Sequence, residues 1–453
     1  MREEIRILSP TAILGYGFPQ SSFDQGMKHK PDVIAVDAGS SDPGPYYLGA
    51  GKSFTDAQAV KRDLRIMLKA GIKEKIPVII GTAGGSGANS HVDWCLEIIR
   101  DIAQEEDLHF KMAVIGAEID QKFLRKQLDQ GTISALDPGQ PLTEEQLAAT
   151  TRVVAQMGTE PIINALNNQA DVILAGRAYD PAVFAALPMI QGFDPGLALH
   201  LGKILECAAI AAIPGSGSDC MFGILRQDSF SIFPLNPERK CTVTSVAAHT
   251  LYEKTNPYIL PGPGGVLDLK ECHFSQENEN TVRVTGSRFI PAEKYTLKLE
   301  GAKVVGYRAL SIAGARDPVF ISQLDTIIKG VEDRLCDNFK EVDPQSYQLM
   351  FHIYGRDGVM GDLEPTPEIK SHEIGIIIEV VADTQEMANT LISFARSTIL
   401  HYGYTGRIAT AGNLAFPYSP SDLQGGPVYE FSVYHLLQVE DPAELFPISW
   451  EEI

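Results

Sequence analysis

The chain has 453 residues, of which 44% are hydrophobic and 21% are charged, a composition typical of a globular protein with two or three domains. Acidic residues outnumber basic residues by 58 to 38, and the formal charge of −20 argues against nucleic acids and anionic membranes as partners, because both need a basic surface. The six cysteines form no C-x-x-C pair, residues 1–10 lack the apolar core of a signal peptide, and no stretch is apolar enough to span a membrane, so we expect a cytoplasmic protein.

Four short apolar runs lead directly into loops rich in glycine, serine, asparagine and acidic residues. They are residues 33–36, 78–80, 113–115 and 172–174. Continuous β-branched runs are typical of strands that are buried on both faces, as in a parallel sheet. Such sheets bind ligands at the carboxyl ends of their strands, so the polar loops indicate where a site lies.

Helix signals separate these predicted strands. T-x-x-Q capping boxes begin at Thr55 and Thr143, and the second of the two helices is expected to continue to Gly158. Another helix is expected from Asn89, and a later one covers residues 195–212. The alternation of strands and helices predicts an α/β fold with a Rossmann-like, mostly parallel sheet.

The second half of the chain predicts shorter strands and a different organisation. We expect an α/β domain over residues 1–220, an α+β continuation over residues 221–342 and a small ferredoxin-like domain over residues 343–453. Residues 300–302 are predicted to form a hairpin turn between two strands. One long amphipathic helix is predicted after Asp317, which caps it.

A glycine-rich loop follows the second apolar run and precedes a helix. Backbone amides between Gly84 and Asn89, with Gly85 and Ser86 among them, suit a phosphate or a carboxylate, although a tight turn explains the same residues. The loop lacks the last glycine of G-x-G-x-x-G, and residues 49–53 lack the first glycine of a P-loop. The sequence therefore carries no fingerprint for a nicotinamide, flavin or nucleoside triphosphate cofactor.

Charged residues gather in or near the loops at the predicted strand ends. Asp37, Asp42, Glu118 and Asp180 could hold a divalent metal through oxygen atoms, or one of them could act as a base with a raised pKa. Arg177 is placed to bind a substrate carboxylate through two hydrogen bonds. Helix capping and loop turns are the alternative explanation for these residues.

A second group of candidates lies on the predicted helix over residues 195–212. His200 and Lys203 are one turn apart and could act as an acid–base pair. Alternatively, His200 packs in the interior and Lys203 pairs with Glu206 on the surface. The small residues that follow, including Ser216 and Ser218, allow a ligand to approach the backbone.

A third group lies between residues 220 and 253. His249 and Glu253 have the i, i+4 spacing of a base and its orienting carboxylate, or of two metal ligands, and a pair on the helix surface explains them equally well. Two residues do not specify zinc, so the metal requirement stays open. Cys220 could be a nucleophile beside either histidine, although a lone cysteine is more often a small core residue.

Three of these motifs together resemble the acyclic terpene utilisation family, AtuA-like. They are VDAGSSDPG at residues 36–44, GTAGG at residues 81–85 and AGRAYD at residues 175–180. The resemblance implies the architecture expected above, including a small ferredoxin-fold domain after Pro344. It also implies a link to terpene degradation through acyl-CoA intermediates, and it supplies no catalytic residues.

We therefore expect a catabolic enzyme that acts on a small carboxylate or an acyl-CoA by general acid–base chemistry, as a lyase, hydratase or isomerase. Asp37 or His200 would move protons and Arg177 would hold a carboxylate. Two alternatives stay open: a non-catalytic subunit that binds an acyl-CoA or carboxylate within a multi-enzyme complex, and a hydrolase with a cysteine or serine nucleophile. Ordered loops near the carboxyl terminus predict a lid over the site or a contact within a homo-oligomer.

Overall fold

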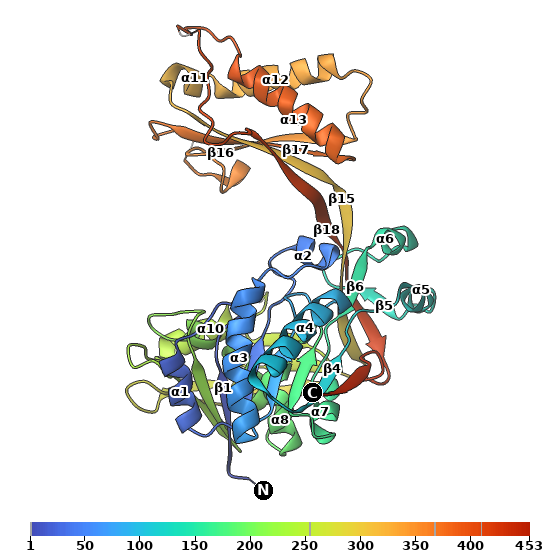
Figure 1. Cartoon of the computed structure of the whole chain (residues 1–453), viewed down its shortest axis with the longest axis vertical. Coiled ribbons are helices and arrows are strands. Elements are labelled where there is room, and N and C mark those ends of the chain that lie inside the picture. Colours follow the sequence, from blue (N-terminus) through green and yellow to red (C-terminus); the bar gives the residue numbers. More distant parts are fainter. Residues whose placement is uncertain (1, 253–254, 367, 409) are drawn as a thin grey trace. The chain divides into compact units, whose positions relative to one another are not determined.

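The computed structural model describes residues 2–252, 255–366, 368–408 and 410–453. The chain divides into two compact units: unit 1 is Met1–Lys303 with Phe431–Ile453, and unit 2 is Val304–Glu430. This division differs from the predicted boundaries after residues 220 and 342. The reason is that two long strands, β15 (Tyr295–Ala315) and β18 (Asp422–Val439), each contribute residues to both units (Figure 1).

Unit 1 is built on a ten-stranded sheet. Its central strands β1, β2, β3, β7 and β4 pair in parallel, and antiparallel strands extend both edges. From edge to edge the strands are β12 (His273–Gln276), β13 (Val282–Thr285), β9 (Ser229–Pro234), β8 (Met221–Arg226), β1 (Glu4–Ser9), β2 (Val33–Asp37), β3 (Val78–Gly81), β7 (Val172–Ala175), β4 (Lys111–Ile115) and β19 (Ile448–Glu452).

The α/β class predicted from the sequence is confirmed, but the sheet is mixed. Strands after residue 220, which were expected in an α+β continuation of the main domain, extend the same sheet beyond β1. The parallel strands run in the order β1-β2-β3-β7-β4, which differs from the 3-2-1-4-5-6 order of dinucleotide-binding folds.

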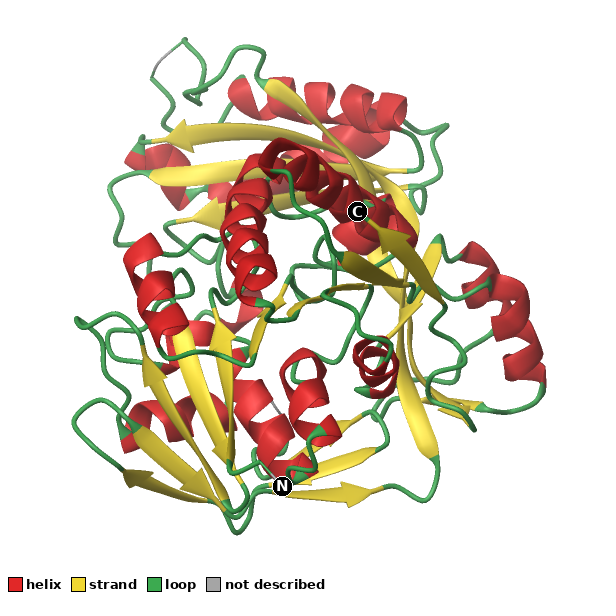
Figure 2. Cartoon of the chain, turned by 60° about the horizontal axis from the view of Figure 1, so that its bottom comes forward, coloured by secondary structure: helices red, strands yellow, loops and turns green. Residues whose placement is uncertain are grey.

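Both faces of the parallel strands are buried, as their continuous apolar runs predict. On β2, Val33 and Ala35 belong to one hydrophobic core, whereas Ile34 and Val36 belong to another. Helices α1, α3 and α4 pack on the second core, and α7, α8 and α9 pack on the first. Figure 2 shows helices on both sides of the strands.

The helices of unit 1 vary in length from one turn to five. They are α1 (Gln20–Lys28), α2 (Pro45–Ala50), α3 (Ala57–Glu74), α4 (Asn89–Glu106), α5 (Gln121–Asp129), α6 (Glu144–Ala149), α7 (Glu160–Asn167), α8 (Ala182–Ile190), α9 (Pro195–Leu205) and α10 (Val243–Leu251). In the described residues, none of the helices is long and apolar enough to cross a membrane.

Smaller sheet segments complete unit 1. Strand β6 (Arg152–Ala155) pairs with the first part of β15, and β5 (Ile133–Ala135) pairs with the last part of β18. A three-stranded antiparallel sheet contains β10 (Ile259–Gly262), β11 (Gly265–Asp268) and β14 (Arg288–Pro291).

Unit 2 is a small α+β unit with its own core. Strands β16 (Tyr347–Tyr354) and β17 (Ile374–Ala382) pair antiparallel with each other, and β17 also pairs with the last part of β15. Helices α12 (Leu324–Asn338) and α13 (Gln385–Leu400) pack on the sheet through a separate hydrophobic core. The short helix α11 (Pro318–Ser322) precedes α12, so the predicted single helix is interrupted at Gln323.

Several local predictions are confirmed and others are wrong. The helix expected from Asn89 begins there, and Thr143 caps α6 with the predicted capping box. Helix α3, in contrast, is capped by the carboxylate of Asp56 instead of Thr55. The helix expected to reach Gly158 ends at Ala149, because the next residues form β6 against β15.

Candidate functional site

The candidate site lies at the carboxyl ends of three neighbouring parallel strands. Asp37 is the last residue of β2, and its backbone is in register with Gly81 at the end of β3. Arg177 follows β7, and its amide donates a hydrogen bond to the carbonyl oxygen of Gly87 at 3.2 Å. The sequence therefore predicted correctly that Asp37, the glycine-rich loop and the loop after β7 lie at one edge of the sheet.

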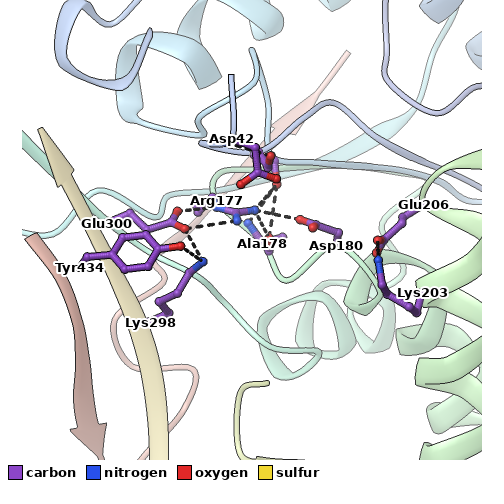
Figure 3. Close-up of polar contacts among 11 residues, drawn as sticks. Asp42, Arg177, Ala178, Asp180, Lys203, Glu206, Lys298, Glu300 and Tyr434 are labelled. Carbon is purple, nitrogen blue, oxygen red and sulfur yellow. Dashed lines mark hydrogen bonds and ion pairs between the residues drawn. The ribbon is translucent and has the colours of Figure 1, made fainter. Parts of the chain in front are cut away.

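The guanidinium group of Arg177 is buried, with its side chain 3% exposed. It donates to the Oε2 atom of Glu300 at 2.7 Å, to the Oδ1 atom of Asp180 at 2.9 Å and to the carbonyl oxygen of Ala178 at 2.6 Å (Figure 3). Charge-assisted hydrogen bonds of this kind fix both partners in one geometry. Arg177 is thus engaged by two carboxylates of the chain before any ligand arrives.

Glu300 is the site residue that the sequence analysis missed. The predicted hairpin turn is absent, because β15 continues through residues 300–302 and places the Glu300 side chain in the interior, 0% exposed. Burial alone would raise the pKa of this carboxyl, but Arg177 and Lys298 lower it to about 2. Lys298 reaches Glu300 at 2.7 Å and the Tyr434 hydroxyl at 3.3 Å. The alternation of Leu297 and Leu299 with charged residues was the signal for an uninterrupted strand.

Asp37 has the environment of a protonated carboxylic acid. It is 7% exposed, and its Oδ1 atom has no hydrogen-bond partner among the described residues. Burial and the nearby carboxylates of Asp180 and Glu206 raise the pKa of Asp37 well above its ordinary value, against the opposing effect of Arg177. Desolvation and like charges both disfavour the ionised form, so this site retains a proton to higher pH than a solvated aspartate.

Helix α9 contributes a second ion pair to the same region. The Lys203 ammonium group and the Glu206 carboxylate are 2.5 Å apart, and both side chains are buried. The surface location that the sequence left open for this pair is therefore wrong. Burial, followed by the charge of Lys203, lowers the pKa of His249 to about 4.

His200 occupies the interior instead of the site. Its Nδ1 atom is 2.7 Å from the Ser287 hydroxyl, and its Nε2 atom is 3.1 Å from the Thr250 hydroxyl. Burial, followed by the charge of Lys203, lowers the pKa of His200 to about 3. Both nitrogen atoms are satisfied and the ring is neutral, which favours the packing explanation over proton transfer. Glu253, the predicted partner of His249, lies outside the described residues.

The glycine-rich loop is shaped by close packing against β7. A Cβ atom added to Gly87 would lie 2.0 Å from the backbone nitrogen of Arg177, so only glycine fits there. The first amide of α4, at Asn89, donates to the carboxylate of Glu118 at 2.8 Å. Glu118 thus supplies the negative charge at this helix terminus, as the capping explanation predicted. The Ser86 hydroxyl is buried without a hydrogen-bond partner among the described residues.

The remaining candidates lie in turns or in the core. Asp42 is exposed, and its amide donates to the Ser40 hydroxyl, while the Ser218 amide donates to the Ser216 hydroxyl. Cys220 is fully buried, and burial raises the pKa of its thiol well above the ordinary value. A buried neutral thiol is a poor nucleophile, so the structure disfavours a thiol hydrolase.

The chemistry available at this edge is proton transfer and charge stabilisation. Within the residues that the structure describes, no group of three or more histidine, cysteine or acidic side chains is arranged to hold a metal ion. The site contains one carboxyl that favours its neutral form, Asp37. Two buried ion pairs lie in the same region, Arg177 with Glu300 and Lys203 with Glu206. Groups with such shifted pKa values are typical of acid–base catalysts.

Comparison with known proteins establishes the family. A model described as "Acyclic terpene utilisation family protein AtuA" matches residues 47–215 and 234–417. The chain therefore belongs to the acyclic terpene utilisation family AtuA. The matched ranges include Arg177, Lys203 and Glu300, whereas Asp37 precedes them. No curated protein matches the chain.

Proposed function

We propose that this chain is an enzyme of acyclic terpene catabolism that moves a proton on a small carboxylate or an acyl-CoA, in a lyase, hydratase or isomerase reaction. Family membership implies a role in acyclic terpene utilisation. The observation that carries the chemistry is the buried Asp37 carboxyl, whose Oδ1 atom has no partner among the described residues. A neutral carboxylic acid can donate a proton or a hydrogen bond to a substrate oxygen.

The charged residues around Asp37 have supporting roles in this proposal. Asp180 keeps the Asp37 proton in place through its negative charge, and Arg177 moderates that effect. Arg177 is itself held by Glu300, so the charge balance at Asp37 depends on a residue of β15. Glu206, which is paired with Lys203, adds its negative charge to the effect of Asp180 on Asp37.

Deuterium incorporation tests the proposal directly. The protein is incubated in D₂O with branched-chain enoyl-CoA and acyl-CoA esters, and products are analysed by mass spectrometry for added water or exchanged hydrogen. We expect Asp37→Asn to lower turnover by about 100-fold or more, the usual contribution of a general acid or base. Asp101→Asn, in an exposed ion pair of α4, serves as the matched control and should keep full turnover.

Two results would contradict the proposal. Full turnover by Asp37→Asn would remove this carboxyl from the chemistry. Saturable binding of a CoA ester without any product or exchange would favour the non-catalytic binding subunit instead.

A further inference from the structure

A small, partly open cavity of about 70 Å³ lies within unit 1. Its walls are mainly aromatic and aliphatic, with contributions from Tyr179, Met189, Leu199, Phe289 and Tyr295. Glu160 also lines it, but its carboxylate accepts a hydrogen bond from the Tyr295 hydroxyl at 2.8 Å. The acidic group is therefore satisfied within the wall, and the cavity presents an apolar interior.

Two elements connect this cavity to the candidate site. Leu199, Lys203 and Glu206 have the i, i+4, i+7 spacing of one stripe of α9, so the cavity wall is one turn from the buried ion pair. Tyr179 is the residue between Ala178 and Asp180 in the loop after β7. The cavity is thus adjacent to the site through both the helix and the loop.

Tyr179 provides a polar group at the boundary between cavity and site. Its side chain is 9% exposed, and its hydroxyl is not among the fully buried polar atoms that lack a partner in the described part of the chain. Burial raises the pKa of this hydroxyl above its ordinary range, and the charges of Glu206 and Lys203 act on it as well. A tyrosine hydroxyl in the wall of a cavity offers a hydrogen-bond donor to a ligand oxygen atom.

We propose that this cavity is a subsite for a short branched apolar group of the substrate. An oxygen atom of the same substrate accepts a hydrogen bond from the Tyr179 hydroxyl. This inference rests on the proposed function and adds the shape of the substrate's apolar end. An apolar cavity of roughly 150 Å³ binds benzene, and the volume here is about 70 Å³. Groups of the size of isopropyl or smaller fit, whereas a full prenyl chain does not.

Calorimetric titration with acetate, isobutyrate and isovalerate tests the subsite. Each buried methylene in an apolar pocket improves binding by about 10-fold or more, so we expect isovalerate to bind at least about 10-fold more tightly than acetate. Leu199→Phe and Met189→Phe fill the cavity from two different helices. Each should abolish the preference for isovalerate over acetate while the affinity for acetate is retained. Leu363→Phe, at an exposed position of unit 2, should leave the preference unchanged.

The outcomes separate this inference from the proposed function. Equal affinity for acetate and isovalerate in the wild type, or a preference that survives both cavity-filling variants, overturns the subsite alone. A clear preference in a protein whose Asp37→Asn variant keeps full turnover supports the subsite and overturns the proposed chemistry. Failure of all three carboxylates to bind overturns the subsite, whereas turnover of the CoA esters still decides the proposed function.

Discussion

At the scale of single residues, opposite charges buried next to each other determine the properties of the site. Arg177 and Lys298 share the carboxylate of Glu300, and Arg177 also holds Asp180. A buried guanidinium group and a half-buried ammonium group without a carboxylate between them would carry a large desolvation cost. Glu300 is therefore the residue on which both the local fold and the charge balance at Asp37 depend.

We expect Glu300→Gln to lower the free energy of unfolding by about 3–5 kcal/mol, because it leaves the buried Arg177 and the half-buried Lys298 without their shared carboxylate. Urea denaturation at pH 7 measures this value. Glu97→Gln, in an exposed pair with Arg100, should cost less than about 1 kcal/mol. Equal effects of the two variants would show that the buried pair contributes no more than a surface pair.

The pH dependence of the Glu300 contribution has a definite sign. The pKa of this carboxyl is lowered to about 2 in the folded chain, below the ordinary value of a solvated glutamate. The stabilisation is thus fully present above the unfolded pKa and is lost as the pH falls from there toward about 2.

The opposite sign applies to Asp37. Its pKa is raised in the folded chain above the ordinary value of 3.8, so the folded protein loses stability as the pH rises from that value toward the folded pKa. Asp37→Asn removes this loss, and we expect the variant to gain on the wild type by up to about 1.4 kcal/mol per pH unit. Urea titrations between pH 5 and pH 8 measure the difference; a constant difference would mean that Asp37 titrates normally.

At the scale of elements, the loops after the parallel strands are positioned by backbone packing as well as by side chains. Gly87 and Gly131 have nearly the same backbone angle, with φ of +67° and +69°. A side chain at Gly87 would meet the backbone of Arg177, whereas no atom lies within 4 Å of one at Gly131. Substitutions at these two glycines therefore separate the free-energy cost of a positive φ from the cost of the contact between a side chain and the Arg177 backbone.

We expect Gly131→Ala to cost about 1–2 kcal/mol, the penalty of a left-handed conformation for alanine. Gly87→Ala should cost several kcal/mol more and should shift the loop that carries Arg177. Thermal denaturation of the two variants provides the comparison. Similar melting temperatures would mean that the loop moves away from β7 without difficulty.

The start of α3 gives a test at the same scale. Asp56 accepts hydrogen bonds from the amides of Gln58 and Ala59, so we expect Asp56→Ala to cost about 1 kcal/mol. Thr55→Val removes the hydroxyl of the capping box that the sequence predicted. We expect it to lower the free energy of unfolding by less than Asp56→Ala does. A larger loss of stability for Thr55→Val than for Asp56→Ala would favour Thr55 as the cap of α3, as the sequence predicted.

At the scale of the whole molecule, unit 2 is an insertion within the sequence of unit 1. Its core residues, such as Phe320 and Leu391, form a cluster separate from the two cores on the faces of the large sheet. Separate cores allow separate unfolding transitions. The chain enters unit 2 within β15 and returns to unit 1 at Phe431, within β18.

We expect calorimetry to resolve two transitions that respond to different substitutions. Phe320→Ala, in the core of unit 2, should lower the free energy of unfolding of one transition by about 3–5 kcal/mol. Phe23→Ala, in a core of unit 1, should lower the free energy of unfolding of the other. Both phenylalanines are fully buried, which makes the pair a matched comparison. A single transition lowered equally by both would show that the units unfold together.

The sequence by itself determined the features that depend on neighbouring residues. Apolar runs identified β2, β3, β4 and β7, and the polar residues that follow them identified the edge of the sheet where Asp37 and Arg177 lie. These predictions succeeded because the face that a side chain occupies follows from the local period of the strand. The T-x-x-Q pattern at Thr143 likewise needs only the residues within one helical turn.

Only the tertiary structure decided which distant residues meet. Glu300 reaches Arg177 across 123 residues of sequence, and no local pattern at either residue specifies the other. The same holds for His200, whose neutrality comes from burial between Ser287 and Thr250. Partners of buried charges are set by long-range packing, because each charge takes whichever compensating group the fold brings within hydrogen-bond distance.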